Sequence, residues 1–162
     1  DTGKTTTVAA ELEHIRNYIM IQECRHTDSI EFKTEAAEEV MNCETVRFVL
    51  QPLVENAIVH GLEPTGEQGT IWIKIYGEQG KLIMSVEDDG LDADVEELEG
   101  LLARYQEGLR GMGLSNVNDR IRLCYGEGYG IQFERREPKG LIVRVIQPLV
   151  AGGGQKEGGQ YD

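Results

Sequence analysis

The segment from residue 51 to residue 61 carries polar side chains that a helix would bring together. At 100° per residue, Gln51 and Glu55 fall on one flank of such a helix, and Asn56 and His60 share another. The side that remains is an apolar stripe of Leu50, Leu53, Val54, Ala57 and Ile58. We expect Gly61 to end the helix. A carboxylate, a carboxamide and an imidazole backed by core suit a metal-bound anion, such as the phosphates of a nucleotide. The alternative is an ordinary solvated helix face.

Two further groups stand at the ends of regular elements. Asp88 and Gly90 follow an alternating segment, where a strand ends. Arg110, Gly111 and Gly113 stand directly before a helical pattern. Glycines at a helix N-terminus let backbone N–H groups approach a phosphate, and the helix dipole favours negative charge there. Each group alone is weak evidence, since a lone aspartate is more often a turn residue. Their order along the chain is what points to a nucleotide site.

The periodicity of the chain predicts the elements that position these groups. Helices are expected at about residues 7–25, 45–60 and from 111 onward, with an acidic, partly helical stretch at 92–108. Strands are expected at 29–34, 70–76, 81–87, 129–134 and 141–146. Pro52 predicts either a kink or a helix that begins near it. The grouping predicts an α+β two-layer sandwich: one mixed, mostly antiparallel sheet with about three helices on one face.

Composition limits the possible functions. The 162 residues are enough for one domain with a core, and the net charge of -13 argues against general nucleic-acid binding. A small anionic ligand is not excluded, because it experiences the local field of its site. No apolar run approaches the 18 residues of a membrane span, and no signal peptide is recognisable. We expect the chain to be a fragment of a longer protein.

The cysteines give no indication of a metal site. Cys24, Cys43 and Cys124 are odd in number, far apart and placed in apolar-patterned segments. Reduced, buried thiols are therefore predicted in preference to disulfides or a metal site. With three histidines in the chain, no CxxC or HExxH pattern exists.

Taken in order, the motifs resemble the ATP-binding domain shared by sensor histidine kinases, gyrase and MutL, and most closely the LytS/YesM-like sensor histidine kinases. QPLVENAIVHG at 51–61 is similar to their N box, VEDDG at 86–90 to their G1 box, and GMGLSNVNDRIRLCYGEGYGI at 111–131 to their G2 box with the following helix and strand. ELEHIRNYIMIQECR at 11–25 resembles the segment that precedes their ATP-binding domain. The resemblance covers about residues 8 to 149 and implies the Bergerat ATP-binding fold.

The resemblance implies a role for each matching residue of the first two boxes. Asn56 would hold Mg²⁺, which bridges the phosphates of ATP, since a carboxamide oxygen suits this hard cation. Glu55 would orient or activate the attacking group, or support the metal through water, and His60 would face the phosphates. Asp88 would accept a hydrogen bond from the exocyclic amine of adenine. Gly90 would let the backbone pass close to the ring.

The G2 box would complete the phosphate site. Its glycines would cradle the phosphates, its arginine would neutralise developing charge, and the segment from Gly90 to Arg110 would form a mobile ATP lid. The residues implied here are Arg110, Gly111, Met112, Gly113 and Leu114. Phosphoryl transfer depends mostly on positioning and electrostatics, which this set would supply together with Glu55.

Several positions depart from the pattern of the family. Asp92 stands where a second G1 glycine is usual, and Asp89 replaces an asparagine. Leu109 stands at the first G2 glycine, unless Gly108 serves with a shift, and Leu141 replaces a threonine. A carboxylate at 92 within a few ångströms of the phosphates would cost on the order of one or two kcal/mol, or roughly tenfold in affinity. We therefore expect Asp92 to weaken ATP binding.

The phosphoacceptor histidine of the family lies upstream, in a helical dimerisation domain. His14 lies on a predicted helix but lacks the surrounding motif, so we expect the acceptor to lie outside this sequence. Residues 1–27 would be a frayed polar segment and a linker helix from that missing domain. Residues 28–150 would form the catalytic ATP-binding domain, and 151–162 a disordered glycine-rich tail.

The resemblance implies the catalytic domain of a two-component sensor histidine kinase. It would transfer the γ-phosphate of Mg·ATP to a histidine of the dimerisation domain, from which a response regulator would receive it. The full-length parent would be a homodimeric membrane sensor with this domain in the cytoplasm. Two alternatives remain open: a degenerate module that holds nucleotide without kinase activity, and an ATPase of the gyrase or MutL kind with Glu55 as hydrolytic base.

Overall fold

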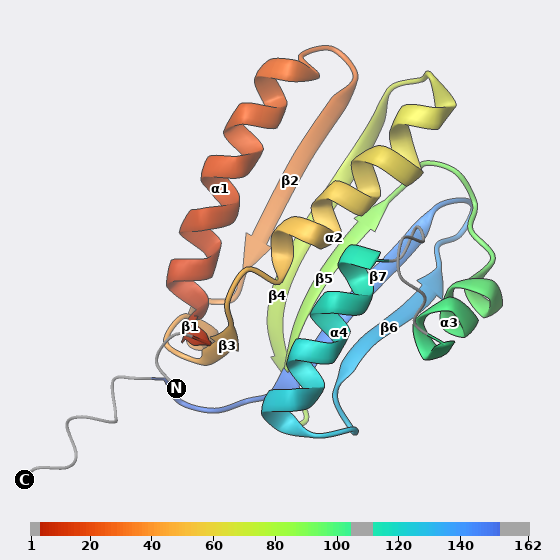
Figure 1. Ribbon diagram of the computed structural model, residues 1–162. Helices are drawn as coiled ribbons and strands as arrows, with labels where there is room; N and C mark the ends of the chain where they lie inside the picture. The colour runs from red at the N-terminus through yellow and green to blue at the C-terminus, as the bar shows by residue number, and fades with distance from the viewer. Residues whose placement is uncertain (1–3, 105–111, 153–162) are drawn as a thin grey trace, which may run out of the picture.

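Alternating apolar residues build a five-stranded sheet, which forms one layer of the computed structural model (Figure 1). The structure describes residues 4–104 and 112–152. The strands are β2 (Ile30–Ala36), β4 (Gly69–Glu78), β5 (Lys81–Asp88), β6 (Gly130–Arg135) and β7 (Leu141–Pro148). Their order is β2-β4-β5-β7-β6, with β2 parallel to β4 and the other neighbours antiparallel. The predicted mixed, mostly antiparallel sheet is confirmed.

Helices cover one face of this sheet. α1 (Val8–Arg25), α2 (Leu50–Asn56) and α4 (Met112–Tyr125) lie across it, and α3 (Val95–Arg104) lies beside β6 (Figure 1). The apolar stripe of each helix meets the inward side chains of the strands, so one continuous core forms between the layers. Within it, Ile71, Ile73 and Ile75 of β4 are all at most 1 % exposed. The predicted two-layer α+β sandwich is confirmed.

α2 begins later than its sequence pattern suggested. Residues 44–46 are not helical but form strand β3 (Glu44–Val46), and the helix starts at Leu50. Pro52 therefore sits in the first turn, where a missing backbone N–H breaks no helical hydrogen bond. Of the two possibilities that Pro52 raised, a helix beginning near it is confirmed.

Gly61 does not end this helix, contrary to our expectation. The chain continues from α2 into a π-helical turn, η2 (Ala57–Leu62), and then a 3₁₀ turn, η3 (Glu63–Thr65). The left-handed residue that ends the run is Gly66, with φ of 68°. A glycine is needed at position 61 because the Asp88 carboxylate packs closely against it.

Both ends of the described chain are held by backbone hydrogen bonds. β1 (Thr5–Thr7) pairs antiparallel with β3, so these residues are not frayed. Ala151 forms a bridge with Cys43, and the Gly152 N–H donates to the Asn42 carbonyl at 2.6 Å. The expected disordered tail is therefore wrong for Ala151 and Gly152, and residues 153–162 lie outside the described part. A second short 3₁₀ turn, η1 (Glu38–Val40), lies between β2 and β3.

The cysteines are free thiols, as expected, but they are not buried. Cys24 and Cys124 are exposed, and Cys43 is half-buried, where burial raises the pKa of its thiol. The stripe of α4 places Leu114, Val117 and Ile121 in the core, all at most 3 % exposed. Cys124 continues that spacing, but it lies in the last turn of the helix, at a surface cavity beside Phe48.

Candidate functional site

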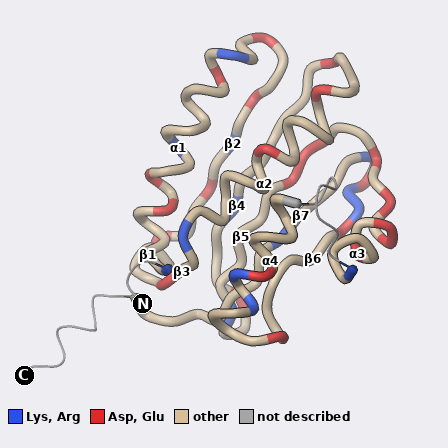
Figure 2. The backbone as a smooth tube through the Cα atoms, viewed as in Figure 1, with Lys and Arg blue, Asp and Glu red and all other residues tan. Residues whose placement is uncertain are grey.

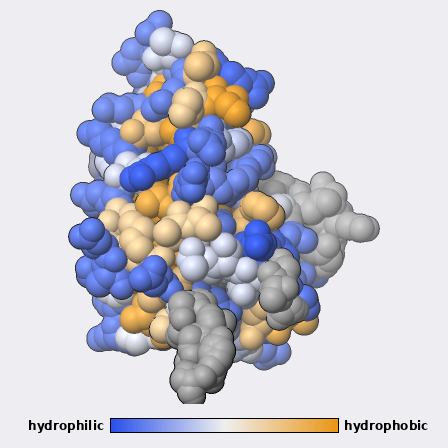
Figure 3. Space-filling model, turned by 90° about the vertical axis from the view of Figure 1, so that its left-hand side faces the viewer, coloured by the Kyte–Doolittle hydropathy of each residue, from blue (hydrophilic) through white to orange (hydrophobic). Residues whose placement is uncertain are grey.

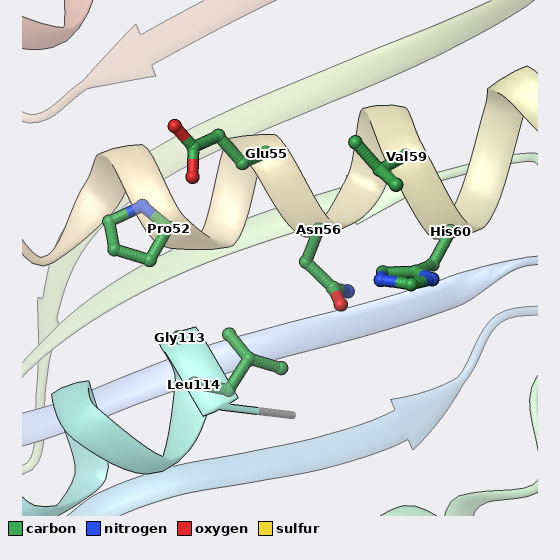
Figure 4. A pocket seen from close by; sticks show the side chains of 7 residues that line it. All are labelled: Pro52, Glu55, Asn56, Val59, His60, Gly113 and Leu114. Carbon is green, nitrogen blue, oxygen red and sulfur yellow. The ribbon is translucent and has the colours of Figure 1, made fainter. Parts of the chain in front are cut away.

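A cavity of about 180 Å³ lies between α2 with its π-helical extension and the first turn of α4. It is lined by Pro52, Glu55, Asn56, Val59, His60, Gly113 and Leu114. The side chains of Asn56 and His60 point to the same side of the helix, toward the start of α4 (Figure 4). Glu55 turns its carboxylate to the other side of the ribbon (Figure 4). The structure therefore brings the N-box residues and the end of the G2 box together, as the sequence predicted.

Asn56 is the most enclosed polar group in this wall. The residue is 8 % exposed, so a ligand would reach its carboxamide mainly from the cavity. His60 follows within the π-helical turn, which begins directly after Asn56. π-helical turns are rare and frequently occur at functional sites. Here the turn fixes the relative placement of the two side chains.

A smaller cavity of about 70 Å³ adjoins the first one. Both share Asn56 and His60, and the second is completed by Gly61, Asp88, Leu91, Asp92, Ala93 and Leu141. Asp88 is 3 % exposed at the end of β5, and its Oδ1 accepts a hydrogen bond from the Gly90 N–H at 2.8 Å. A buried carboxylate beside a small cavity is suited to bind a ligand N–H group.

Glycines allow the end of β5 to approach the helix this closely. A Cβ at Gly61 would lie 2.7–2.8 Å from the Asp88 carboxylate, and a Cβ at Gly90 would overlap the Gly61 carbonyl. The Leu91 N–H donates to that same carbonyl at 2.9 Å. Gly61 and Gly90 are thus required for packing around Asp88, which the sequence pattern did not reveal.

The Asp92 carboxylate has two partners, which the estimate of its effect on ATP binding did not include. Its Oδ1 accepts from the Gly140 N–H at 3.1 Å, and its Oδ2 is 3.3 Å from Nη2 of Arg135. The carboxylate thus joins the segment after the G1 box to the turn between β6 and β7. Because the Arg135 guanidinium lies beside it, we expect a smaller penalty for ATP than the tenfold estimated for a carboxylate without a partner.

The other departures also have structural roles among the described residues. Asp89 accepts a hydrogen bond from the Thr70 N–H at 2.8 Å and so fixes the start of β4. Leu141 is 3 % exposed and forms part of the wall of the smaller cavity. Arg110, Gly111 and Leu109 lie outside the described residues, as does the end of the expected lid. Met112 begins α4.

α1 contributes residues that sequence reasoning missed. The Glu11 carboxylate, 2 % exposed, accepts from the backbone N–H groups of Phe48, Val49 and Leu50 at 2.9, 2.8 and 3.2 Å. It therefore caps the N-terminus of α2, where the N-cap residue itself makes no side-chain bond. The signal was a glutamate inside the apolar pattern of α1, one position before Leu12.

The donor set fits a magnesium ion that arrives with its ligand. Within the described residues, no group of three or more His, Cys, Asp or Glu side chains forms a metal site. Asn56 offers one neutral oxygen, which matches an ion that keeps waters and takes its other ligands from phosphates. The site thus suits Mg²⁺ as part of a nucleotide complex.

The model of the family described as "Histidine kinase-, DNA gyrase B-, and HSP90-like ATPase" matches residues 42–151. The chain is 34% identical over 142 residues to the sensor histidine kinase YesM of Bacillus subtilis, covering 88% of this chain and 24% of YesM. It is 37% identical over 131 residues to the sensor histidine kinase YpdA of Escherichia coli, covering 81% and 22%. The chain thus spans about a quarter of the length of these curated relatives.

A solved structure supports the same assignment. The nucleotide-free catalytic domain of the histidine kinase ThkA superposes with a TM-score of 0.68 and 27% sequence identity, covering 90% of this chain and 98% of that one. No helix among the described residues is both long enough and apolar enough to cross a membrane. By its sequence, its fold and the arrangement of its boxes, the chain belongs to the family of histidine kinase-, DNA gyrase B- and HSP90-like ATPases.

Proposed function

We propose that this chain is the catalytic ATP-binding domain of a two-component sensor histidine kinase. One observation carries the proposal: Asn56 and His60 face the start of α4 across a cavity, and the buried Asp88 lies at the adjoining one. The relatives that share this sequence are named sensor histidine kinases. Because His14 lacks the motif that surrounds the acceptor in the family, we assign the phosphoacceptor histidine to another part of the full-length protein.

The two cavities divide the binding of Mg·ATP between them. Asp88 accepts the exocyclic amine of adenine in the smaller one. The carboxamide of Asn56 would hold the Mg²⁺ that accompanies the phosphates, with His60 beside it. The N-terminus of α4 lies on the far side of the larger cavity, where its dipole favours the phosphate charge. The remaining phosphate contacts would come from the backbone of Gly111, Met112, Gly113 and Leu114 and from the side chain of Arg110.

Chemistry then depends on position and electrostatics. Glu55 orients the attacking histidine or accepts its proton. A structure of ThkA holds the response regulator TrrA (TM-score 0.64, 21% identity, covering 91% of this chain and 42% of that one). We accordingly assign a response regulator as the next acceptor. The full-length protein acts as a homodimer, with this domain in the cytoplasm and the sensor part in the membrane.

Phosphorylation of the full-length protein tests this proposal. With [γ-³²P]ATP and Mg²⁺, the parent should acquire acid-labile phosphate on histidine and pass it to its response regulator. Replacement of the metal ligand, Asn56→Ala, should slow labelling about 100-fold or more. Asn17→Ala, on the exposed side of α1, is the matched control and should label at the parental rate. Steady release of phosphate without a labelled protein would contradict the proposal and favour a hydrolytic ATPase.

A further inference from the structure

α1 presents polar side chains to α2 along a single face. Glu11, His14 and Tyr18 are spaced by three and four residues, so they lie one above another on the helix. Glu11 caps the start of α2, as described above. His14 is half-buried, and its Nε2 lies 3.1 Å from Oε1 of Gln51 on α2. The ring is also held edge-on against Phe48, with centroids 4.9 Å apart.

Gln51 extends this contact to the candidate catalytic carboxylate. Its Nε2 donates a hydrogen bond to Oε2 of Glu55 at 3.0 Å, one helical turn further on. The chemistry of the groups sets the direction of the chain of bonds. An ionised Glu55 only accepts, so Gln51 must turn its NH₂ toward Glu55 and its oxygen toward His14. His14 must then carry a proton on Nε2.

Such support matters for Glu55 because its side chain is long and flexible. The residue is exposed, and a glutamate side chain free to rotate about three bonds loses conformational entropy whenever it is fixed. The Gln51 amide restrains it in advance. Tyr18 faces the same region: burial, and secondly the negative charge of Glu55, raise the pKa of its phenol to about 12. A tyrosine is protonated at neutral pH even without this shift, so Tyr18 is a neutral neighbour of Glu55.

We propose that His14 and Gln51 form a hydrogen-bond relay by which α1 holds the Glu55 carboxylate on the side of α2 away from Asn56 and His60, where it would meet the attacking histidine during phosphoryl transfer. The proposal rests on the proposed kinase function, in which Glu55 acts on the attacking histidine. It makes His14 a positioning residue and not a phosphate acceptor. A hydrogen bond on Nε2 and an edge contact with Phe48 both hold the ring against α2. The relay would also let α1, which precedes the ATP-binding boxes in the sequence, affect the rate of catalysis.

Rates measured on the full-length protein test the relay. Gln51→Met keeps the shape but removes both hydrogen bonds, and should slow single-turnover labelling about tenfold or more with the Kd for Mg·ATP within twofold. His14→Phe should slow it about threefold to tenfold. His14→Gln restores an N–H donor and should recover the rate to within twofold. Glu13→Gln, an exposed neighbour on α1, is the control with parental rate and melting temperature.

Two results distinguish failure of the relay from failure of the proposed function. Parental rates in Gln51→Met and His14→Phe, together with a loss of labelling in Glu55→Gln, overturn the relay alone. Absence of transfer in the parent overturns the proposed function. If the parent shows no transfer, the relay is tested separately by ¹⁵N-imidazole NMR near pH 8. We expect the His14 proton on Nε2, with a resonance that moves in Gln51→Met. A proton on Nδ1, or a resonance unchanged by Gln51→Met, overturns it.

Discussion

Asn56 presents a neutral carboxamide to a cavity in which the phosphates of Mg·ATP would lie. A carboxylate at this position would bind Mg²⁺ more strongly but would repel the phosphates that carry it. Asp88, in contrast, is a carboxylate that is 3 % exposed beside the smaller cavity. There a negative acceptor matches the amine of an adenine ring. In the proposed complex, the neutral amide would face the charged phosphates and the acid would face the neutral N–H donor of adenine.

Asp92 gives a prediction at this scale. Asp92→Asn removes the charge but keeps an acceptor for the Gly140 N–H, and Asp92→Gly removes both. Since Arg135 already offsets the charge, Asp92→Asn should change the Kd for Mg·ATP less than about threefold by calorimetry. Asp92→Gly should not bind more tightly than Asp92→Asn. A tenfold gain in affinity in both variants would restore the idea that Asp92 repels the phosphates.

The N-box residues depend on the contact between α1 and the start of α2. α2 has seven residues, Leu50–Asn56, and its N-cap residue makes no side-chain hydrogen bond. The helical run continues into η2 and η3, but the N–H groups of its first turn depend on partners from outside the helix. Glu11 is such a partner and accepts three backbone N–H groups from a buried position. The orientation of Asn56 therefore depends on a residue of another helix.

Loss of this cap should destabilise the fold. Glu11→Ala leaves three N–H groups without a partner and should lower the free energy of unfolding by about 2–4 kcal/mol, measured by urea denaturation. Glu11→Gln retains one acceptor oxygen and should lose about half as much. Glu13→Gln, two residues away and exposed, should be neutral. If Glu11→Ala were as stable as Glu13→Gln, the cap would not stabilise the fold.

Local patterns were sufficient to predict most elements. The alternation of Ile71, Ile73 and Ile75 marked β4, and the helical spacing of Val8, Leu12 and Ile15 marked α1. The N-box wall could be predicted because its residues lie on one continuous segment. By contrast, β3 has three residues, too few for a periodic signal, and it exists because β1 and Gln147 pair with it.

Features that depend on contacts between distant segments could not be predicted. Gly61 was interpreted as a helix stop. A glycine is needed there because of the Asp88 carboxylate, 27 positions further along the chain, and no local pattern indicates that contact. The effect of Asp92 on ATP binding was estimated without a partner for its carboxylate, because its partners come from the β6–β7 turn. The capping role of Glu11 could not be assigned from its motif, since a cap contributed by another helix has no fixed spacing. Each of these interactions requires the folded arrangement of the elements.

At the scale of the whole molecule, the site must bind a polyanion on a protein of net charge -13. Acidic residues lie along α1 and α3 (Figure 2). The side that carries α1 is mostly hydrophilic, with smaller hydrophobic areas (Figure 3). At physiological salt, charges more than about 8 Å from a ligand are largely screened, so the groups that line the cavities decide binding. The acidic surface still disfavours nucleic acids.

Calorimetric titration of the chain with Mg·ATP tests the central claim, that the two cavities form one nucleotide site. We predict saturable binding at one site per chain. Asp88→Asn should weaken it about 30-fold, since it replaces a charged acceptor by a neutral amide, and removal of Mg²⁺ with EDTA about tenfold. Asp89→Asn, the adjacent carboxylate that bonds the Thr70 N–H, should stay within threefold. Absence of binding at millimolar ATP, or parental affinity in Asp88→Asn, would contradict the claim.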